Sequence, residues 1–147
     1  MHVRFAEKRD MEAIVEMARA NAESRPNLTF NETRTRAAVV DYLTSAKPTF
    51  WVVEDKDDVI GFLCADFLIY RAFDGLFTVQ EVIYVKPEKR GTRAATLLMK
   101  TLISWSEYLG AKEIIGGVDN EQNIDRTAKF LSHFGFKKVG YAMRKEV

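Results

Sequence analysis

The chain has 147 residues, of which 47% are hydrophobic and 29% charged, a composition typical of one globular domain that can bury a proper core. Its 22 basic and 21 acidic residues leave a formal net charge of +1, which gives no electrostatic basis for nucleic acid or a membrane surface as the main partner. The single cysteine excludes an internal disulfide, the two histidines show no metal-ligand cluster, and no apolar run approaches the ~20 residues of a membrane span, so we expect a soluble cytoplasmic protein.

Hydrophobic periodicity predicts the secondary structure. Short apolar runs rich in β-branched and aromatic residues predict strands over residues 3–6, 49–54, 59–68, 76–85 and 113–118, and a final strand or hairpin over residues 136–144. Apolar residues that recur every three or four positions predict helices over residues 10–23, 31–46, 92–109 and 124–134. Asp10 and Asn31 are the expected N-caps of the first two helices, and Lys47-Pro48 ends the second.

The predicted elements follow in the order β-α-α-β-β-β-α-β-α-β. An antiparallel meander therefore leads into a β-α-β unit, which predicts an α/β fold of the mixed α+β type, with a central mixed β-sheet flanked by helices. Gly61, inside the third strand, indicates a bulge or a close backbone approach. A polar loop is expected over residues 119–122. We expect a single domain over residues 1–147.

The stretch from Gln80 to Met99 combines a strand, a turn at Pro87-Glu88-Lys89 and the start of a helix. The N–H groups of a turn and the positive end of a helix can together hold an anionic, phosphate-bearing ligand. Glu81 adds a carboxylate on the strand. The alternative interpretation is a plain strand–turn–helix connection whose arginines lie in solvent.

Three short segments carry a resemblance to a known family. Residues 85–91 (VKPEKRG) look like a V-x-P-x-x-R-G motif, residues 130–136 (FLSHFGF) are similar to F-Y-x-K-x-G-F, and residues 140–145 (GYAMRK) resemble a closing strand. With the element order, they make nearly the whole chain resemble the Gcn5-related N-acetyltransferase (GNAT) superfamily. The resemblance implies an acyl-CoA N-acyltransferase-like fold and acetyl-CoA as the acetyl donor.

The resemblance also implies a set of cofactor-binding residues. In the family, the pantetheine arm of coenzyme A lies between two splayed strands, and this gives the strand partners as Ile83, Tyr84 and Val85. The pyrophosphate meets the helix N-terminus, which gives its binding residues as Arg90, Gly91, Thr92, Arg93, Ala94, Ala95 and Thr96. Arg93 stands where the family pattern Gln/Arg-x-x-Gly-x-Gly/Ala has its first glycine, so a positive φ there would penalise the arginine. Asn123 follows the next strand, where family members often place an asparagine near the pantetheine.

Acetyl transfer to an amine needs a base to take the amine proton. Glu81 lies where many family members carry this base, and burial in an apolar strand would raise its pKa. The alternative is a glutamate paired with a nearby arginine or lysine. Alternation along the strand places Glu81, Ile83 and Val85 on one face, opposite Gln80, Val82 and Tyr84.

An acid often protonates the leaving thiolate, and here its usual residue is missing. The family's frequent tyrosine precedes the Gly-Phe pair by four residues, and this chain has Leu131 at that position. Tyr141, Tyr84, Ser132 or a water can take its place, and the sequence does not choose among them.

We therefore expect an N-acetyltransferase that moves an acetyl group from acetyl-CoA to a primary amine by direct transfer in a ternary complex. The acceptor is an amine on a small molecule, a protein N-terminus or a lysine, bound near residues 24–31 and 70–75. The alternative is a non-catalytic acyl-CoA-binding or protein-interaction domain of the same fold, which Leu131 and Arg93 favour. The resemblance is also compatible with a homodimer, because such domains often pair through sheet edges or C-terminal strands.

Overall fold

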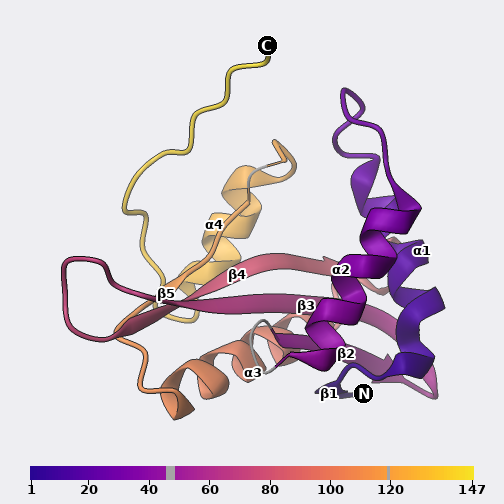
Figure 1. Ribbon diagram of the computed structural model, residues 1–147, viewed down its shortest axis with the longest axis horizontal. Helices are drawn as coiled ribbons and strands as arrows, with labels where there is room; N and C mark the ends of the chain where they lie inside the picture. Colours follow the sequence, from indigo (N-terminus) through magenta and orange to yellow (C-terminus); the bar gives the residue numbers. More distant parts are fainter. Residues whose placement is uncertain (46–48, 119) are drawn as a thin grey trace. The chain divides into compact units, whose positions relative to one another are not determined.

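The computed structural model describes residues 1–45, 49–118 and 120–147 (Figure 1). The predicted helix end at Lys47-Pro48 and the first residue of the predicted polar loop, Asp119, lie outside these ranges. The chain divides into two compact units, residues 1–116 and 117–147, and each is described by itself. No helix in the described ranges has both the length and the apolar character needed to cross a bilayer.

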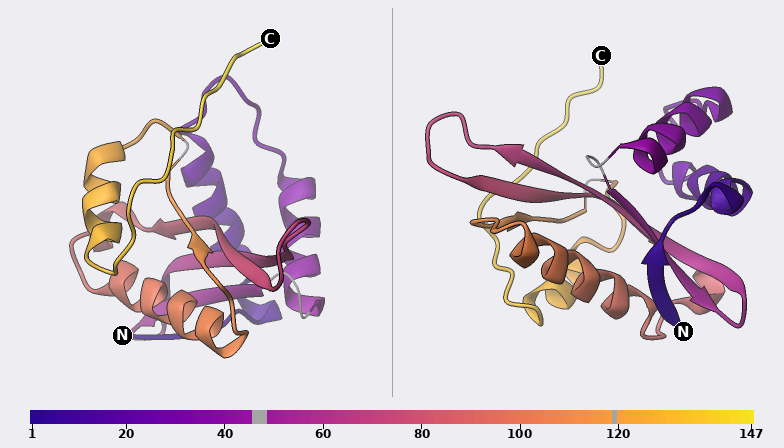
Figure 2. Two further views of the ribbon diagram at one scale, coloured as in Figure 1. Left: turned by 90° about the vertical axis from the view of Figure 1, so that its left-hand side faces the viewer. Right: turned by 60° about the horizontal axis from the view of Figure 1, so that its bottom comes forward.

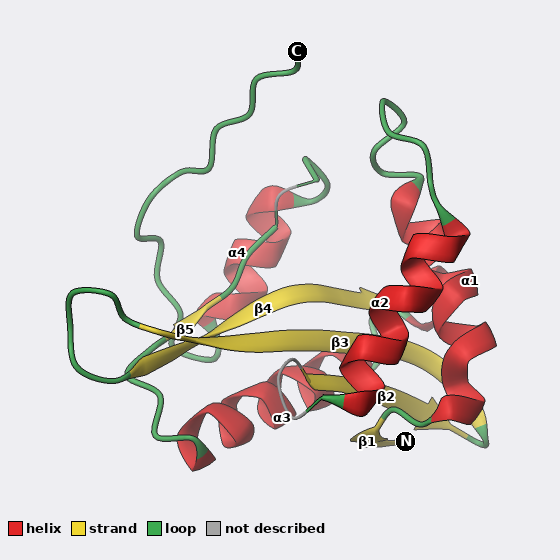
Figure 3. Cartoon of the chain, in the orientation of Figure 1, coloured by secondary structure: helices red, strands yellow, loops and turns green. Residues whose placement is uncertain are grey.

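The first unit contains one mixed sheet of five strands in the order β1-β2-β3-β4-β5 (Figure 3). The strands are β1 His2–Phe5, β2 Thr49–Asp55, β3 Asp58–Ile69, β4 Leu76–Val85 and β5 Ile114–Ile115. Neighbours pair antiparallel except β4 and β5, which are parallel. The predicted mixed sheet is confirmed. The strand predicted over residues 113–118 is shorter than expected, because two glycines follow Ile115 and glycine weakens a strand.

Helices cover both faces of this sheet (Figure 2). On one face lie α1 (Met11–Ala22) and α2 (Glu32–Thr44), and on the other lies α3 (Ala94–Tyr108). The core under α1 and α2 is an apolar cluster of Ile14, Met17, Val39, Phe50, Val52, Val59, Phe62, Cys64 and Tyr84. On the α3 face, Trp105 packs against Trp51 and Phe67 with ring centroids 5.2 and 6.3 Å apart. We refer to these as the α1–α2 face and the α3 face.

The second unit contains one helix, α4 (Ile124–Ser132), in its described residues. Gly135 follows with φ of 88° and terminates it, as predicted. The strand or hairpin predicted over residues 136–144 is wrong, because residues 136–147 form neither helix nor strand. A strand needs a neighbour to take its backbone hydrogen bonds, and the described part of this unit holds no other strand.

The two predicted N-caps have different outcomes. The prediction for Asn31 is confirmed, since its Oδ1 accepts the N–H of Arg34 at 2.9 Å. Asp10 does occupy the N-cap position of α1, as predicted, but its carboxylate makes no cap hydrogen bond to this helix. Asp10 instead accepts the N–H of Glu7 at 2.7 Å and two hydrogen bonds from the Arg4 guanidinium. A charged donor nearby outcompetes the helix N-terminus for this side chain.

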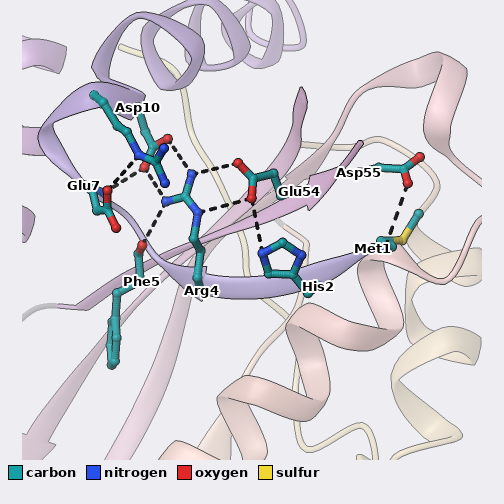
Figure 4. Close-up of polar contacts among 9 residues, drawn as sticks. Met1, His2, Arg4, Phe5, Glu7, Asp10, Glu54 and Asp55 are labelled. Carbon is teal, nitrogen blue, oxygen red and sulfur yellow. Dashed lines mark hydrogen bonds and ion pairs between the residues drawn. The ribbon is translucent and has the colours of Figure 1, made fainter. Parts of the chain in front are cut away.

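Arg4 joins β1 to α1 and to β2 (Figure 4). Its guanidinium lies 2.8 Å from Asp10 and 3.1 Å from Glu54. The Asp10 side chain is only 4% exposed, and burial alone would raise its pKa, but the hydrogen bonds from Arg4 and Glu7 hold the pKa below its ordinary 3.8. The hydrogen bond from Arg4 likewise lowers the pKa of Glu54. This network fixes the start of the chain on the sheet.

Replacing Arg4 by methionine leaves the Asp10 carboxylate buried without its cation. We expect Arg4→Met to lower the free energy of unfolding at pH 7 by about 3 kcal/mol, as for a broken buried ion pair. Because the folded pKa values of Asp10 and Glu54 lie below their unfolded values, the wild-type protein holds this contribution above pH ~4.5 and loses it as the pH falls. Urea unfolding across pH 3–7 should therefore show the two curves converging in acid.

Arg9→Met is the matched control for this substitution. Arg9 pairs with Glu7 at 2.7 Å, and the two side chains are 65% and 54% exposed. We expect this substitution to change the unfolding free energy by less than about 1 kcal/mol. Equal losses in the two variants would contradict the structural role of Arg4.

Candidate functional site

One side of β4 has no strand partner over most of its length. β5 pairs with β4 through Thr78 and Val79, opposite Ile114 and Ile115. No other strand among the described residues of the first unit pairs with β4 on this side. The backbone from Glu81 to Val85 therefore presents an open edge, and we call it the open edge of β4.

A β-bulge lies at the start of this open edge. β3 pairs Cys64 with Val82 and Ala65 with Gln80, so Glu81 is the extra residue on β4. The bulge breaks the alternation along the strand. The prediction that Gln80 shares a face with Val82 is therefore wrong.

Residues that pair across two strands lie on the same face of the sheet, so the partners on β3 show which face each residue beside the bulge occupies. Gln80 pairs with Ala65, the residue after Cys64, and Cys64 belongs to the core of the α1–α2 face. Gln80 is therefore on the α3 face, whereas Val82 is on the α1–α2 face with its partner Cys64.

Glu81 itself is exposed. The burial expected of a glutamate in an apolar strand is absent, because the bulge moves the residue out of the regular pleat. Its charge reaches the α1–α2 face, where it contributes to raising the pKa values of Tyr42 and Cys64. Glu81 thus stands as a solvent-accessible carboxylate at the bulge beside these two groups.

Tyr42 was not singled out as a site residue by the sequence, where it is only one member of the apolar stripe of α2. Its ring packs edge-on against Phe50 at 5.4 Å, and its hydroxyl lies within hydrogen-bonding reach of the Cys64 thiol. Burial, with the nearby Cys64, raises the pKa of Tyr42 well above its ordinary 10.0. Burial also raises the pKa of the Cys64 thiol to about 11. Both groups are protonated at neutral pH, so neither is a nucleophile there.

The three residues predicted to pair with the cofactor do not all turn their backbone N–H and C=O groups to the same side of β4. The N–H of Lys86 donates to Ile60 on β3 at 2.9 Å. Since backbone groups alternate along a strand, those of Ile83 and Val85 face the open edge, whereas those of Tyr84 face β3. The Tyr84 side chain is buried, and its ring stacks on Phe62 with centroids 6.0 Å apart.

The turn after β4 is held against the β2–β3 hairpin. It contains a short 3-10 helix, Pro87–Lys89. Lys86 Nζ lies 3.3 Å from Asp58, and Lys89 Nζ lies 3.5 Å from Asp55. These ion pairs set the position of the following α3 N-terminus relative to the end of β4.

The residues predicted to hold a pyrophosphate, 90–96, run from this turn into α3. Gly91 is the residue with positive φ, at 84°, and Arg93 has φ of −78°. Arg93 therefore carries no backbone strain at the position where the family pattern has glycine. Thr92 Oγ1 accepts the N–H of Ala94 at 3.3 Å, and residues 90–93 are exposed. The first N–H groups of a helix have no intrahelical partner, so this end of α3 can receive an anion.

Four other residues that the sequence singled out lie in the second unit. Asn123 precedes α4 with φ of 50°, and its carbonyl accepts the N–H of Thr127 at 2.9 Å. Ser132 donates to the carbonyl of Lys129 at 2.6 Å, and Tyr141 is 89% exposed. Leu131 is buried. Across the described ranges, no group of three or more His, Cys, Asp or Glu side chains is arranged to hold a metal ion.

Comparisons with known proteins match this architecture. A family model described as acetyltransferase (GNAT) domain matches residues 46–138. A transcriptional regulator from Bacillus halodurans C-125 superposes with a TM-score of 0.85 at 17% identity, covering 99% of this chain and 98% of that chain. AAC(6')-Iy in complex with the bisubstrate analog CoA-S-monomethyl-acetylneamine superposes with a TM-score of 0.78 at 18% identity, covering 99% of this chain and 96% of that chain.

A predicted acetyltransferase with acetyl-CoA from Clostridium acetobutylicum gives a TM-score of 0.77 at 14% identity, with 99% of this chain and 95% of that chain covered. At such identities the likeness establishes the fold, and the predicted acyl-CoA N-acyltransferase-like fold is confirmed. No curated protein matches the sequence significantly.

Gly61 faces the end of β4, and both alternatives predicted for it occur. The register of β2 and β3 shifts beside it, and a Cβ at Gly61 would lie 2.6 Å from the Tyr84 carbonyl oxygen. We expect Gly61→Ala to lower the free energy of unfolding by about 1–3 kcal/mol, because β4 must move to admit the methyl group. Gly140→Ala, with nothing within 4 Å of the added Cβ, is the control. Urea denaturation should separate the two, and equal stabilities would show that β3 and β4 lie further apart here.

Proposed function

The chain belongs to the GNAT acetyltransferase family, and on this premise we propose that it is an acetyl-CoA-dependent N-acetyltransferase. It transfers an acetyl group to a primary amine by direct transfer in a ternary complex. We propose further that residues 1–147 form one catalytic domain. The family model supports this, since its match over residues 46–138 includes parts of both compact units.

The open edge of β4 beside the α3 N-terminus is the observation that carries the proposal. Acetyl-CoA has an extended pantetheine arm with two amides, and an extended ligand can add to an exposed sheet edge as a further strand. Ile83 and Val85 offer their backbone groups to such an arm. The AAC(6')-Iy complex contains a CoA conjugate, and the C. acetobutylicum protein contains acetyl-CoA, which supports the same donor here.

The pyrophosphate of the donor would lie at residues 90–96. The helix end supplies N–H groups and a positive partial charge, and Arg90 and Arg93 add two cationic side chains. The exposure of residues 90–93 supports this placement, because phosphates must approach the backbone from solvent. Asn123 is proposed to contact the pantetheine on the resemblance alone.

Glu81 is proposed as the general base, acting directly or through one water. The amine nitrogen attacks the thioester carbonyl carbon, so that a C–N bond forms and the C–S bond breaks. Glu81 takes the proton that the nitrogen loses, and the departing thiolate takes a proton from solvent. Backbone N–H groups on the open edge can stabilise the oxyanion of the tetrahedral intermediate.

The second candidate is a non-catalytic acyl-CoA-binding or protein-interaction domain. Leu131 favours it, because a leucine cannot protonate a thiolate where the family frequently has tyrosine. An acyl-CoA-binding domain would share the donor site and lack turnover, whereas a protein-interaction domain of this fold would not need the donor at all. A transfer assay therefore separates the enzyme from both.

Titration calorimetry with acetyl-CoA, followed by a thiol-release assay, tests the proposal. The amine panel should contain an aminoglycoside, a peptide with a free N-terminus and a lysine peptide with a blocked N-terminus. Residues 24–31 and 70–75 contain one carboxylate, Asp74, so we expect the peptides to be better acceptors than the polycationic aminoglycoside. Binding without thiol release on any acceptor would favour an acyl-CoA-binding domain, and the absence of binding would refute both the enzyme and the acyl-CoA-binding domain.

Glu81→Gln keeps the shape of the side chain and removes its basicity. We expect kcat to fall about 100-fold while the KM for acetyl-CoA stays unchanged, since general bases contribute factors of this order. Glu107→Gln, at an exposed position on α3, should leave both constants unchanged. Steady-state kinetics with saturating acceptor distinguish the two variants. Wild-type turnover in Glu81→Gln would remove this residue from the mechanism.

A further inference from the structure

The side chain of Arg90 contacts the open edge of β4. Its Nε donates to the carbonyl oxygen of Val85 at 3.0 Å, and its guanidinium lies over the Tyr84 ring at 5.6 Å. Since the backbone groups of Val85 face away from β3, this carbonyl belongs to the open edge. Arg90 thus occupies an acceptor that an added strand or a pantetheine amide would need.

Arg90 differs from the other cations of its turn. Lys86 and Lys89 pair with Asp58 and Asp55 of the β2–β3 hairpin. In the part of the chain that the structure describes, Arg90 has no carboxylate partner, and the residue as a whole is exposed. A guanidinium held by one neutral carbonyl would gain a stronger, charge-assisted bond from a phosphate. Its present contact is therefore one that an anionic ligand can replace.

We propose that Arg90 is a two-position residue, which holds the Val85 carbonyl in one position and moves to a phosphate in the other when acetyl-CoA binds. The inference rests on the proposed function and adds a mechanism for donor selection. A pantetheine amide N–H takes over the vacated carbonyl. Arg90 lowers the affinity for a pantetheine arm alone and raises the affinity for an arm that carries phosphates. It therefore discriminates coenzyme A thioesters from their phosphate-free analogues.

Two donors separate the two positions of Arg90. Acetyl-pantetheine contains the pantetheine arm and the thioester but no phosphate, whereas acetyl-CoA contains the arm, the thioester and the phosphates. For Arg90→Ala we expect acetyl-pantetheine to bind about threefold tighter, because one competing hydrogen bond is gone. We expect acetyl-CoA to bind about tenfold weaker, because the charge-assisted phosphate contact is lost. Dissociation constants from NMR titration of both donors measure the two shifts.

Two further variants complete the test. Arg93→Ala removes an exposed cation of the same segment, one that makes no hydrogen bond to the open edge among the described residues. It should therefore weaken acetyl-CoA binding and leave acetyl-pantetheine binding unchanged. Arg90→Lys keeps the charge and removes the guanidinium, so it should keep the gain for acetyl-pantetheine and recover part of the acetyl-CoA affinity. Unfolding curves confirm that each variant is folded.

Opposite shifts for the two donors in Arg90→Ala would support the proposal. Shifts in the same direction, or an unchanged affinity for acetyl-pantetheine, would overturn it while leaving acetyl-CoA binding intact. A wild-type protein that fails to bind acetyl-CoA would refute the proposed function itself.

Discussion

The open edge of β4 is the constraint on which the rest of the site depends. A backbone N–H or C=O that leaves the sheet must find another partner, whether water, a side chain or a ligand. The parallel pairing with β5 ends after Val79, and the bulge at Glu81 follows directly. At the far end of this edge, Arg90 takes the Val85 carbonyl. β4 and the turn that follows it thus bring together the Glu81 carboxylate, the backbone groups of Ile83 and Val85 that face the open edge, and the cationic residues of the turn.

The surrounding structure keeps this edge in place. Gly61 lets β3 approach the end of β4 closely, and ion pairs from Lys86 and Lys89 attach the following turn to the β2–β3 hairpin. Further along β2, Glu54 joins the Arg4 network that fixes β1 and the start of α1. Gly61, Glu54 and Arg4 of this supporting structure lie on β3, β2 and β1. The exposed groups proposed to act on ligands lie on β4 and in the turn after it.

Sequence patterns predicted the helices and strands better than the geometry of the candidate site. The motif of residues 85–91 gave the turn, and periodicity gave α3, because both signals are local. The bulge at Glu81 was not predicted, because an inserted residue leaves the apolar pattern of a strand almost unchanged. The final strand was wrong because alternation cannot show whether a partner strand exists. The contact of Arg90 with Val85 depends on a rotamer, which no spacing encodes.

The central claim is that the open edge receives the pantetheine arm, and amide hydrogen exchange measured residue by residue by NMR tests it most directly. Without ligand, we predict fast exchange at Ile83 and Val85, whose N–H groups face the edge, and slow exchange at Tyr84, which faces β3. Saturating acetyl-CoA should slow exchange at Ile83 and Val85 and leave Tyr84 unchanged. Bound acetyl-CoA with unaltered exchange at both edge residues would contradict the account.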